Sequence, residues 1–162
     1  MCDASRGFTA DHAIRLGRRL EEFDLTWFEE PVAPYDHRGS ARVAAALDMP
    51  VASGETEATR YGFREMLAHG AADIWMADLA RVGGVSEFVK VAHLAAAHDI
   101  AISNHLFTEQ SIALLGAFAN STWLEYMPWT SKLYREPIVV EDGHVAVPNR
   151  PGLGFTFDPD AI

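Results

Sequence analysis

Amphipathic segments and short apolar runs alternate along the first 126 residues. Ile14, Leu16 and Leu20 lie among charged residues at helical spacing, which predicts a half-buried helix over residues 11–23. Residues 25–28 follow as a continuous apolar run, typical of a short strand that is covered on both faces. The same alternation repeats, and it predicts helices over residues 37–47, 61–68, 85–98 and 110–118 and strands over residues 50–53, 74–76, 101–103 and 123–126.

This alternation predicts an α/β fold with a parallel sheet, because successive parallel strands need a crossover connection that is usually a helix. After Trp129 the pattern changes. Residues 138–140 and 144–147 flank an Asp-Gly pair, which predicts a hairpin. We therefore expect one domain over residues 1–162, in which residues 130–162 form a C-terminal extension packed on the sheet and helices.

Composition narrows the classes of partner. The chain has 23 acidic residues against 13 Lys and Arg, a net charge of -10, and no basic block, so we expect neither nucleic acid nor an anionic membrane as a partner. Cys2 is the only cysteine, which argues against a disulfide framework and favours a reducing, cytoplasmic compartment. We see no signal-peptide pattern, and no apolar stretch approaches the roughly 18 residues that a membrane span needs.

Six chemically capable residues each close a short apolar run, at intervals of 26, 26, 23, 27 and 20 residues. In a barrel of alternating strands and helices, the carboxyl ends of successive strands meet at one mouth. Such spacing therefore predicts five carboxylates and one imidazole at a single site, and a cluster of this negative charge requires a cation. The six residues are Asp3, Glu29, Glu55, Asp78, His105 and Glu125.

The first three of these residues form a candidate metal site. Taken alone, Asp3 is more simply explained as a helix cap or turn residue, and Glu55 could be a cap before Thr59. Glu29 is followed by Glu30, and two adjacent acids at the end of a buried strand are costly unless something compensates them. Together, three carboxylates supply the hard oxygen ligands that Mg²⁺ prefers, with positions left for water and substrate.

The last three residues are candidates for acid–base chemistry and substrate binding. His105 alone is most simply a structural histidine, but Asp78 ends the neighbouring strand and could orient its imidazole as a general acid or base. Glu125 could hydrogen-bond a substrate carboxylate if it were protonated, or pair with an arginine.

Gly83 and Gly84 precede the helix predicted over residues 85–98. A pair of glycines at this position can hold a phosphate, although a tight turn is the simpler interpretation. The sequence contains no phosphate-loop motif, no nucleophile elbow and no zinc motif of the His-Glu-x-x-His type.

Several segments together resemble the C-terminal barrel of the enolase superfamily, in particular the mandelate racemase and muconate lactonizing enzyme subgroup, across the whole chain. These segments are WFEEPVAPYD, PVASGE, DIWMADLARVGGVSEF, SNHLF, WLEY and NRPGLGF. Within the subgroup, the chain is most similar to acid sugar dehydratases such as those acting on galactarate or talarate. The resemblance implies Mg²⁺ ligands at Asp3, Glu29 and Glu55, an acid–base dyad of Asp78 and His105, and a substrate-carboxylate contact at Glu125.

The resemblance also implies an activity. We expect Mg²⁺-dependent removal of the proton next to a carboxylate, through an enediolate, leading to dehydration of an acid sugar by a lyase. Two alternatives stay open: a racemase or epimerase, that is, an isomerase acting on a 2-hydroxy acid, and a catalytically inactive remnant.

The chain departs from the family pattern in three respects. A complete barrel needs about 250 residues, so we expect a partial TIM barrel of about six of the eight strands, without the N-terminal capping domain. The Lys-x-Lys strand that carries the family's second base is not found, since the only lysines are Lys90 and Lys132. Ser5 and Arg6 replace the usual Asn and Gln after the first metal ligand. An open sheet exposes its edges, so we also expect a homo-oligomer.

Overall fold

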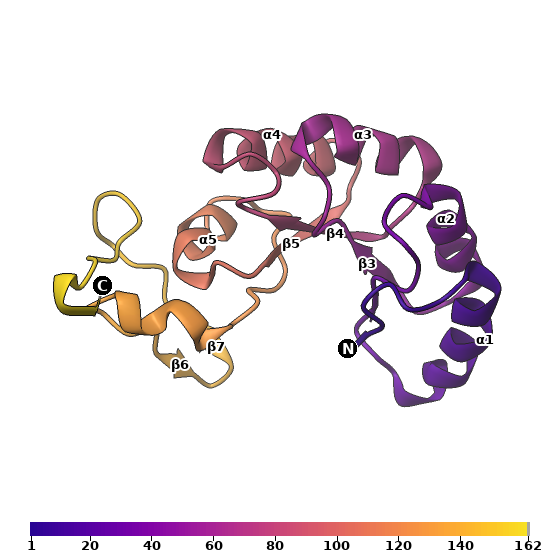
Figure 1. The fold of residues 1–162 in the computed structure, drawn as a ribbon, viewed down its shortest axis with the longest axis horizontal. Coiled ribbons are helices and arrows are strands. Elements are labelled where there is room, and N and C mark those ends of the chain that lie inside the picture. Colours follow the sequence, from indigo (N-terminus) through magenta and orange to yellow (C-terminus); the bar gives the residue numbers. More distant parts are fainter. Residues whose placement is uncertain (162) are drawn as a thin grey trace.

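A five-stranded parallel sheet forms the inner layer of the protein. The computed structural model describes residues 1–161, and its sheet places the strands in the order of the sequence. Figure 1 shows the helices following one another along the outer side of this sheet as an open arc. The strands are β1 (Cys2–Asp3), β2 (Phe28–Glu29), β3 (Val51–Ser53), β4 (Ile74–Asp78) and β5 (Ala101–His105).

A helix follows each strand, as the periodicity predicts. Sequential parallel strands joined by helices are the building pattern of a TIM barrel, so the expected partial barrel is confirmed. The helices are α1 (Ala10–Leu20, continued by a 3₁₀ turn over Glu21–Phe23), α2 (His37–Ala46), α3 (Thr59–His69), α4 (Val85–Ala96) and α5 (Thr108–Leu115).

The apolar runs of the strands are buried on both faces. Trp75 packs with Phe63 of α3 and Phe88 of α4 in the largest core cluster. Its neighbour Met76 contacts a different cluster, together with Trp27 and Ala52 of the adjacent strand segments. Successive side chains of a strand point to opposite faces, so this division explains why the runs are apolar at consecutive positions.

The expected strand over residues 123–126 is not a regular strand. Within the described residues, the parallel bridge nearest to this segment joins Ser121, two residues before it, to Ile102 of β5. Beyond it, the side chain of buried Asn104 replaces the ladder, because its Oδ1 accepts the Glu125 N–H at 2.7 Å and its Nδ2 donates to the Glu125 carbonyl at 3.5 Å. The segment thus lies beside β5 at the end of the sheet, although the prediction of its secondary structure was wrong.

The glycine pair before α4 forms a turn. Gly83 and Gly84 have φ angles of 105° and 85°, in the region that favours glycine, and the Gly84 N–H donates to the Leu79 carbonyl at 2.9 Å. The turn interpretation is therefore confirmed.

The C-terminal residues include the predicted hairpin, with β6 (Val140–Glu141) and β7 (His144–Val145) joined by Asp142 and Gly143. Both turn residues have positive φ, as a two-residue turn of this kind requires. This part of the chain lies next to α5, at the end of the arc opposite α1 (Figure 1), and it contains 3₁₀ turns over Pro128–Leu133 and Pro159–Ala161. Within residues 1–161, no helix combines the length and apolar character needed to cross a membrane.

Candidate active site

The sheet brings five of the six predicted residues to the same edge. Asp3 and Glu29 end β1 and β2 and are paired in register, and Asp78 and His105 end β4 and β5 and are likewise paired. Glu55 follows two residues after β3. Because the strands are parallel, all of these residues lie at the carboxyl edge of the sheet, where TIM barrels carry their active sites.

Asp78 and His105 form a close pair. The His105 Nδ1 lies 2.7 Å from Asp78 Oδ2, and Asp78 is only 1% exposed. The other oxygen, Oδ1, accepts the backbone N–H groups of Ala80 and Arg81 at 2.8 and 2.9 Å. A carboxylate held by two amides accepts the imidazole proton at Nδ1, so the Nε2 atom is left for proton transfer.

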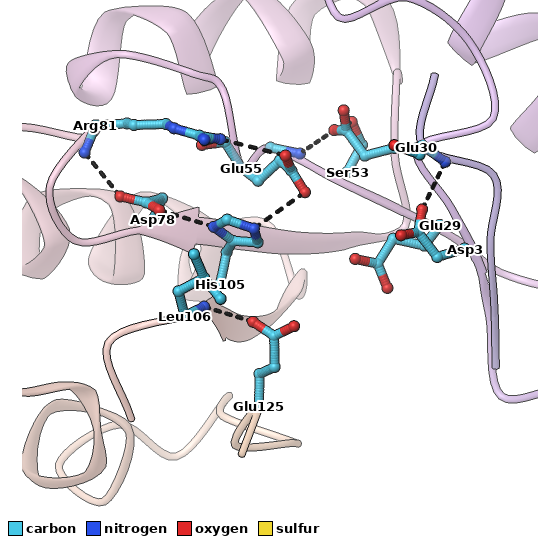
Figure 2. A network of polar contacts seen from close by, with 12 residues as sticks. Asp3, Glu29, Glu30, Ser53, Glu55, Asp78, Arg81, His105, Leu106 and Glu125 are labelled. Atoms are coloured by element: carbon cyan, nitrogen blue, oxygen red, sulfur yellow. Dashed lines mark hydrogen bonds and ion pairs between the residues drawn. The ribbon is translucent and has the colours of Figure 1, made fainter. Parts of the chain in front are cut away.

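Glu55 is held by two arginines and lies beside His105. Its Oε1 lies 3.2 Å from Nη1 of Arg81 and 3.6 Å from Nη1 of Arg6, and its Oε2 lies 3.4 Å from Nε2 of His105. Figure 2 shows the Glu55 carboxylate directed toward His105 and Arg81, with Asp3 and Glu29 together at the other side of the view.

Asp3 and Glu29 occupy the neighbouring strand ends. Asp3 Oδ1 accepts the Ser5 N–H at 2.7 Å, and Glu29 Oε2 accepts the indole N–H of Trp27 at 2.9 Å. Burial raises the pKa of Glu29; the Trp27 hydrogen bond opposes this effect, and the negative charges of Asp3, Glu125 and Glu55 add to it. A nearby cation would relieve both the burial cost and the repulsion.

The residues fit a hard divalent cation in their chemistry, but they are not drawn together as a ligand set. Among residues 1–161, no three His, Cys, Asp or Glu side chains are grouped closely enough to hold a metal ion. Asp3, Glu29 and Glu55 all offer carboxylate oxygens, the ligand type of Mg²⁺. For the three to act together, the Glu55 side chain must leave its arginine partners, so the ligand assignment stays a prediction.

Glu125 lies at the end of the irregular segment beside β5. Its Oε2 accepts the backbone N–H of Leu106, as Figure 2 also shows, and its own backbone is held by Asn104. Within the described residues it forms no ion pair with an arginine, and its contact with a substrate carboxylate stays a prediction.

Three further residues shape the site and were not among the six predicted from the sequence. Glu30 is 2% exposed; its Oε1 accepts the Ser53 hydroxyl and the Gly54 N–H, whereas its buried Oε2 has no hydrogen-bond partner. Burial raises the pKa of Glu30. The two adjacent acids were the available signal for Glu30, but Arg6 and Arg81 carried no sequence signal of pairing with Glu55.

A family model described as "Enolase C-terminal domain-like" matches residues 1–161. The chain belongs to this family. Its fold, its strand order and the position of the candidate residues at the carboxyl edge of the sheet agree with the membership.

The chain is similar to enzymes whose names state a reaction. The chain is 38% identical over 161 residues to L-talarate/galactarate dehydratase of Salmonella typhimurium, covering 99% of this chain and 40% of the relative. It is 38% identical over 179 residues to D-galactarolactone cycloisomerase of Agrobacterium fabrum, covering 100% of this chain and 47% of the relative. The chain therefore spans less than half the length of these relatives.

A solved structure agrees closely with this fold. L-Talarate dehydratase from a Polaromonas species, in a complex with Mg and L-glucarate, matches with a TM-score of 0.94 at 36% identity, over 98% of this chain and 44% of that chain. The similarity thus extends over nearly all of this chain, whereas more than half of the Polaromonas chain has no counterpart here.

Proposed function

We propose that this chain carries the metal-binding and acid–base residues of an Mg²⁺-dependent lyase that dehydrates an acid sugar. The reaction begins with removal of the proton next to the substrate carboxylate. The observation that carries the proposal is the buried Asp78, which holds His105 by Nδ1 and leaves Nε2 next to the Glu55 carboxylate at the carboxyl edge of the sheet.

His105 is the proposed acid–base residue. Its Nε2 takes the proton from the carbon next to the carboxylate, and Asp78 stabilises the imidazolium that forms. The same Nε2–H then protonates the hydroxyl on the adjacent carbon, which departs as water while the carbon–carbon double bond forms. The imidazole is neutral again at the end, because the proton taken from carbon leaves with the hydroxyl as water. The electron pair of the broken C–H bond forms the double bond, and the electron pair of the C–O bond leaves with the oxygen.

Asp3, Glu29 and Glu55 are the proposed Mg²⁺ ligands. When bound, Mg²⁺ would supply the positive charge that stabilises the negative charge developing on the substrate carboxylate. The raised pKa of Glu29, caused first by burial and then by neighbouring carboxylates, supports a cation at this place. Glu125, held in place at Leu106, is proposed to contact the substrate carboxylate.

The comparisons support the reaction class more broadly than the particular product. One named relative is a dehydratase of talarate and galactarate and another is a cycloisomerase, and the Polaromonas structure contains Mg and L-glucarate. Removal of a proton next to a carboxylate is a first step that dehydration, racemisation and epimerisation can share. Dehydration is preferred here because the two similar dehydratases act on acid sugars with neighbouring hydroxyls.

The test is proton exchange. The chain is incubated with Mg²⁺ and a panel of acid sugars, including galactarate and talarate, in D₂O, and ¹H NMR follows both deuterium incorporation next to the carboxylate and loss of water. We expect exchange and dehydration in the unmodified chain, loss of both in His105→Asn, and retention of both in the matched control His98→Asn, since His98 is exposed after α4. Absence of exchange from folded chain, or its survival in His105→Asn, would refute the proposal.

A further inference from the structure

Arg6 stands in the turn after β1 and is held there by its backbone. Its N–H donates to the Glu30 carbonyl at 2.7 Å, and its φ angle is 66°. From this position the guanidinium extends to Glu55, where Nη1 lies 3.6 Å from Oε1. An arginine that starts three residues after Asp3 therefore supplies positive charge to the carboxylate proposed as the third metal ligand.

The two arginines that contact Glu55 are anchored differently. Arg81 is fixed to the acid–base pair, because its backbone N–H donates to Asp78 Oδ1 and its guanidinium also donates to the Glu55 backbone carbonyl at 3.3 Å. Among the described residues, the guanidinium of Arg6 forms an ion pair only with Glu55. Arg6 is thus the partner that can be displaced without disturbing the Asp78–His105 pair.

We infer that the Arg6 guanidinium competes with Mg²⁺ for the Glu55 carboxylate, so that metal binding must displace it. The inference rests on the proposed function, since it takes Glu55 as a metal ligand. The guanidinium groups of Arg6 and Arg81 already lie against Glu55 Oε1, so a metal ion at the same carboxylate would be repelled by both unless one of them moves away. Arg6 acts in this way as a positioning residue that weakens the metal site.

The consequence is measurable as metal affinity. Arg6 is about one-third exposed, so its ion pair with Glu55 is only moderately strong. Losing an exposed ion pair of this kind changes a binding constant by about two- to fivefold. Removing the guanidinium should therefore tighten binding by about two- to fivefold, with a further gain from the lost repulsion.

The experiment titrates Mn²⁺, as a spectroscopic substitute for Mg²⁺, into the chain and follows the free ion by electron paramagnetic resonance. It compares the unmodified chain with Arg6→Gln, with Arg42→Gln and with Glu29→Gln. Arg42 is the matched control, because its removal changes the net charge equally but breaks an exposed pair with Asp11 on the helices. Circular dichroism verifies that each variant is folded.

We expect Arg6→Gln to bind Mn²⁺ more tightly than the unmodified chain, and Arg42→Gln to bind it nearly as the unmodified chain does. Equal affinity in Arg6→Gln and the unmodified chain, with binding that Glu29→Gln weakens, would overturn the role of Arg6 and leave the metal site standing. An equal gain in Arg42→Gln would overturn it as well, since net charge alone would then explain the change. No binding by either the unmodified chain or Arg6→Gln would overturn both the inference and the proposed metal site.

A second measurement needs no variant. The side-chain Nε–H resonance of Arg6 in a ¹H–¹⁵N spectrum should shift as Mg²⁺ is added, because the guanidinium loses its carboxylate partner. An unchanged resonance at saturating metal would contradict the displacement.

Discussion

Replacing Asp78 by Asn is the sharpest test of how the acid–base pair is built. The carboxylate accepts three hydrogen bonds, from Ala80, Arg81 and His105. In Asp78→Asn, the carboxamide oxygen can still accept the two backbone N–H groups, so the turn should persist. The carboxamide NH₂ then faces His105 Nδ1, and a donor at this position requires that nitrogen to be an acceptor.

The expected result is a reversed imidazole tautomer in a folded protein. Hydrogen bonds to a charged group contribute about 1.5–3 kcal/mol each and those to a neutral group about 0.5–1.5 kcal/mol, while the variant also avoids the cost of burying a charge. The free energy of unfolding should therefore fall by only about 1–3 kcal/mol. The proton-exchange rate should fall far more, by about 10⁴-fold, as it does when the equivalent change reverses the histidine tautomer in a serine protease.

The assay is a long-range ¹H–¹⁵N spectrum of the imidazole groups, recorded at a pH where they are neutral. His105 should carry its proton on Nδ1 in the unmodified chain and on Nε2 in Asp78→Asn, while exposed His98 serves as the internal reference in both. Urea unfolding and the D₂O exchange assay complete the comparison. An unchanged tautomer in the variant, or exchange at the unmodified rate, would refute the assigned role of Asp78.

Two further predictions concern stability. Lys90 and Arg60 lower the pKa of Glu87 to about 2, so its contribution to the free energy of unfolding is fully present above the ordinary pKa of 4.5 and is lost as the pH falls toward 2. In urea unfolding between pH 6 and pH 2, the free energy of unfolding should therefore fall less for Glu87→Gln than for the unmodified chain. An equal fall in both proteins would contradict this. Phe63 is fully buried with its ring centroid 5.1 Å from that of Trp75, so Phe63→Ala should lower the free energy of unfolding by about 3–5 kcal/mol in urea, and a loss below about 1 kcal/mol would show that the core does not depend on this contact.

Most regular elements could be predicted from the sequence because each has its own periodicity. The helix predicted over residues 85–98 is observed as Val85–Ala96, and the strand over residues 101–103 extends to His105. The prediction of a strand over residues 123–126 was wrong for a physical reason. Its apolar residues indicate burial, but whether such a run joins a ladder depends on the neighbouring strand, and here the Asn104 side chain binds the Glu125 backbone in place of ladder bonds.

The candidate site, too, could be predicted only in part. The regular spacing correctly indicated that Asp78 and His105 lie side by side, because residues at the ends of adjacent parallel strands are paired in register. It could not indicate the direction of the Glu55 side chain, which follows a turn and is held by two arginines from different loops. Which ion partner a long side chain contacts depends on the distance between the residues in the folded chain, and the sequence does not give that distance.

The pattern of residues along the chain is enough to specify the alternation of strands and helices, the apolar faces that bury the sheet, and the order of acidic and histidine residues along its carboxyl edge. Local periodicity and chain connectivity are sufficient for these features. Three contacts are visible only in the folded chain: Asp78 holds His105 through Nδ1, Glu30 is buried next to the end of β3, and Arg6 and Arg81 hold Glu55. These contacts join residues from separate turns, and their positions depend on how the whole sheet and its helices pack.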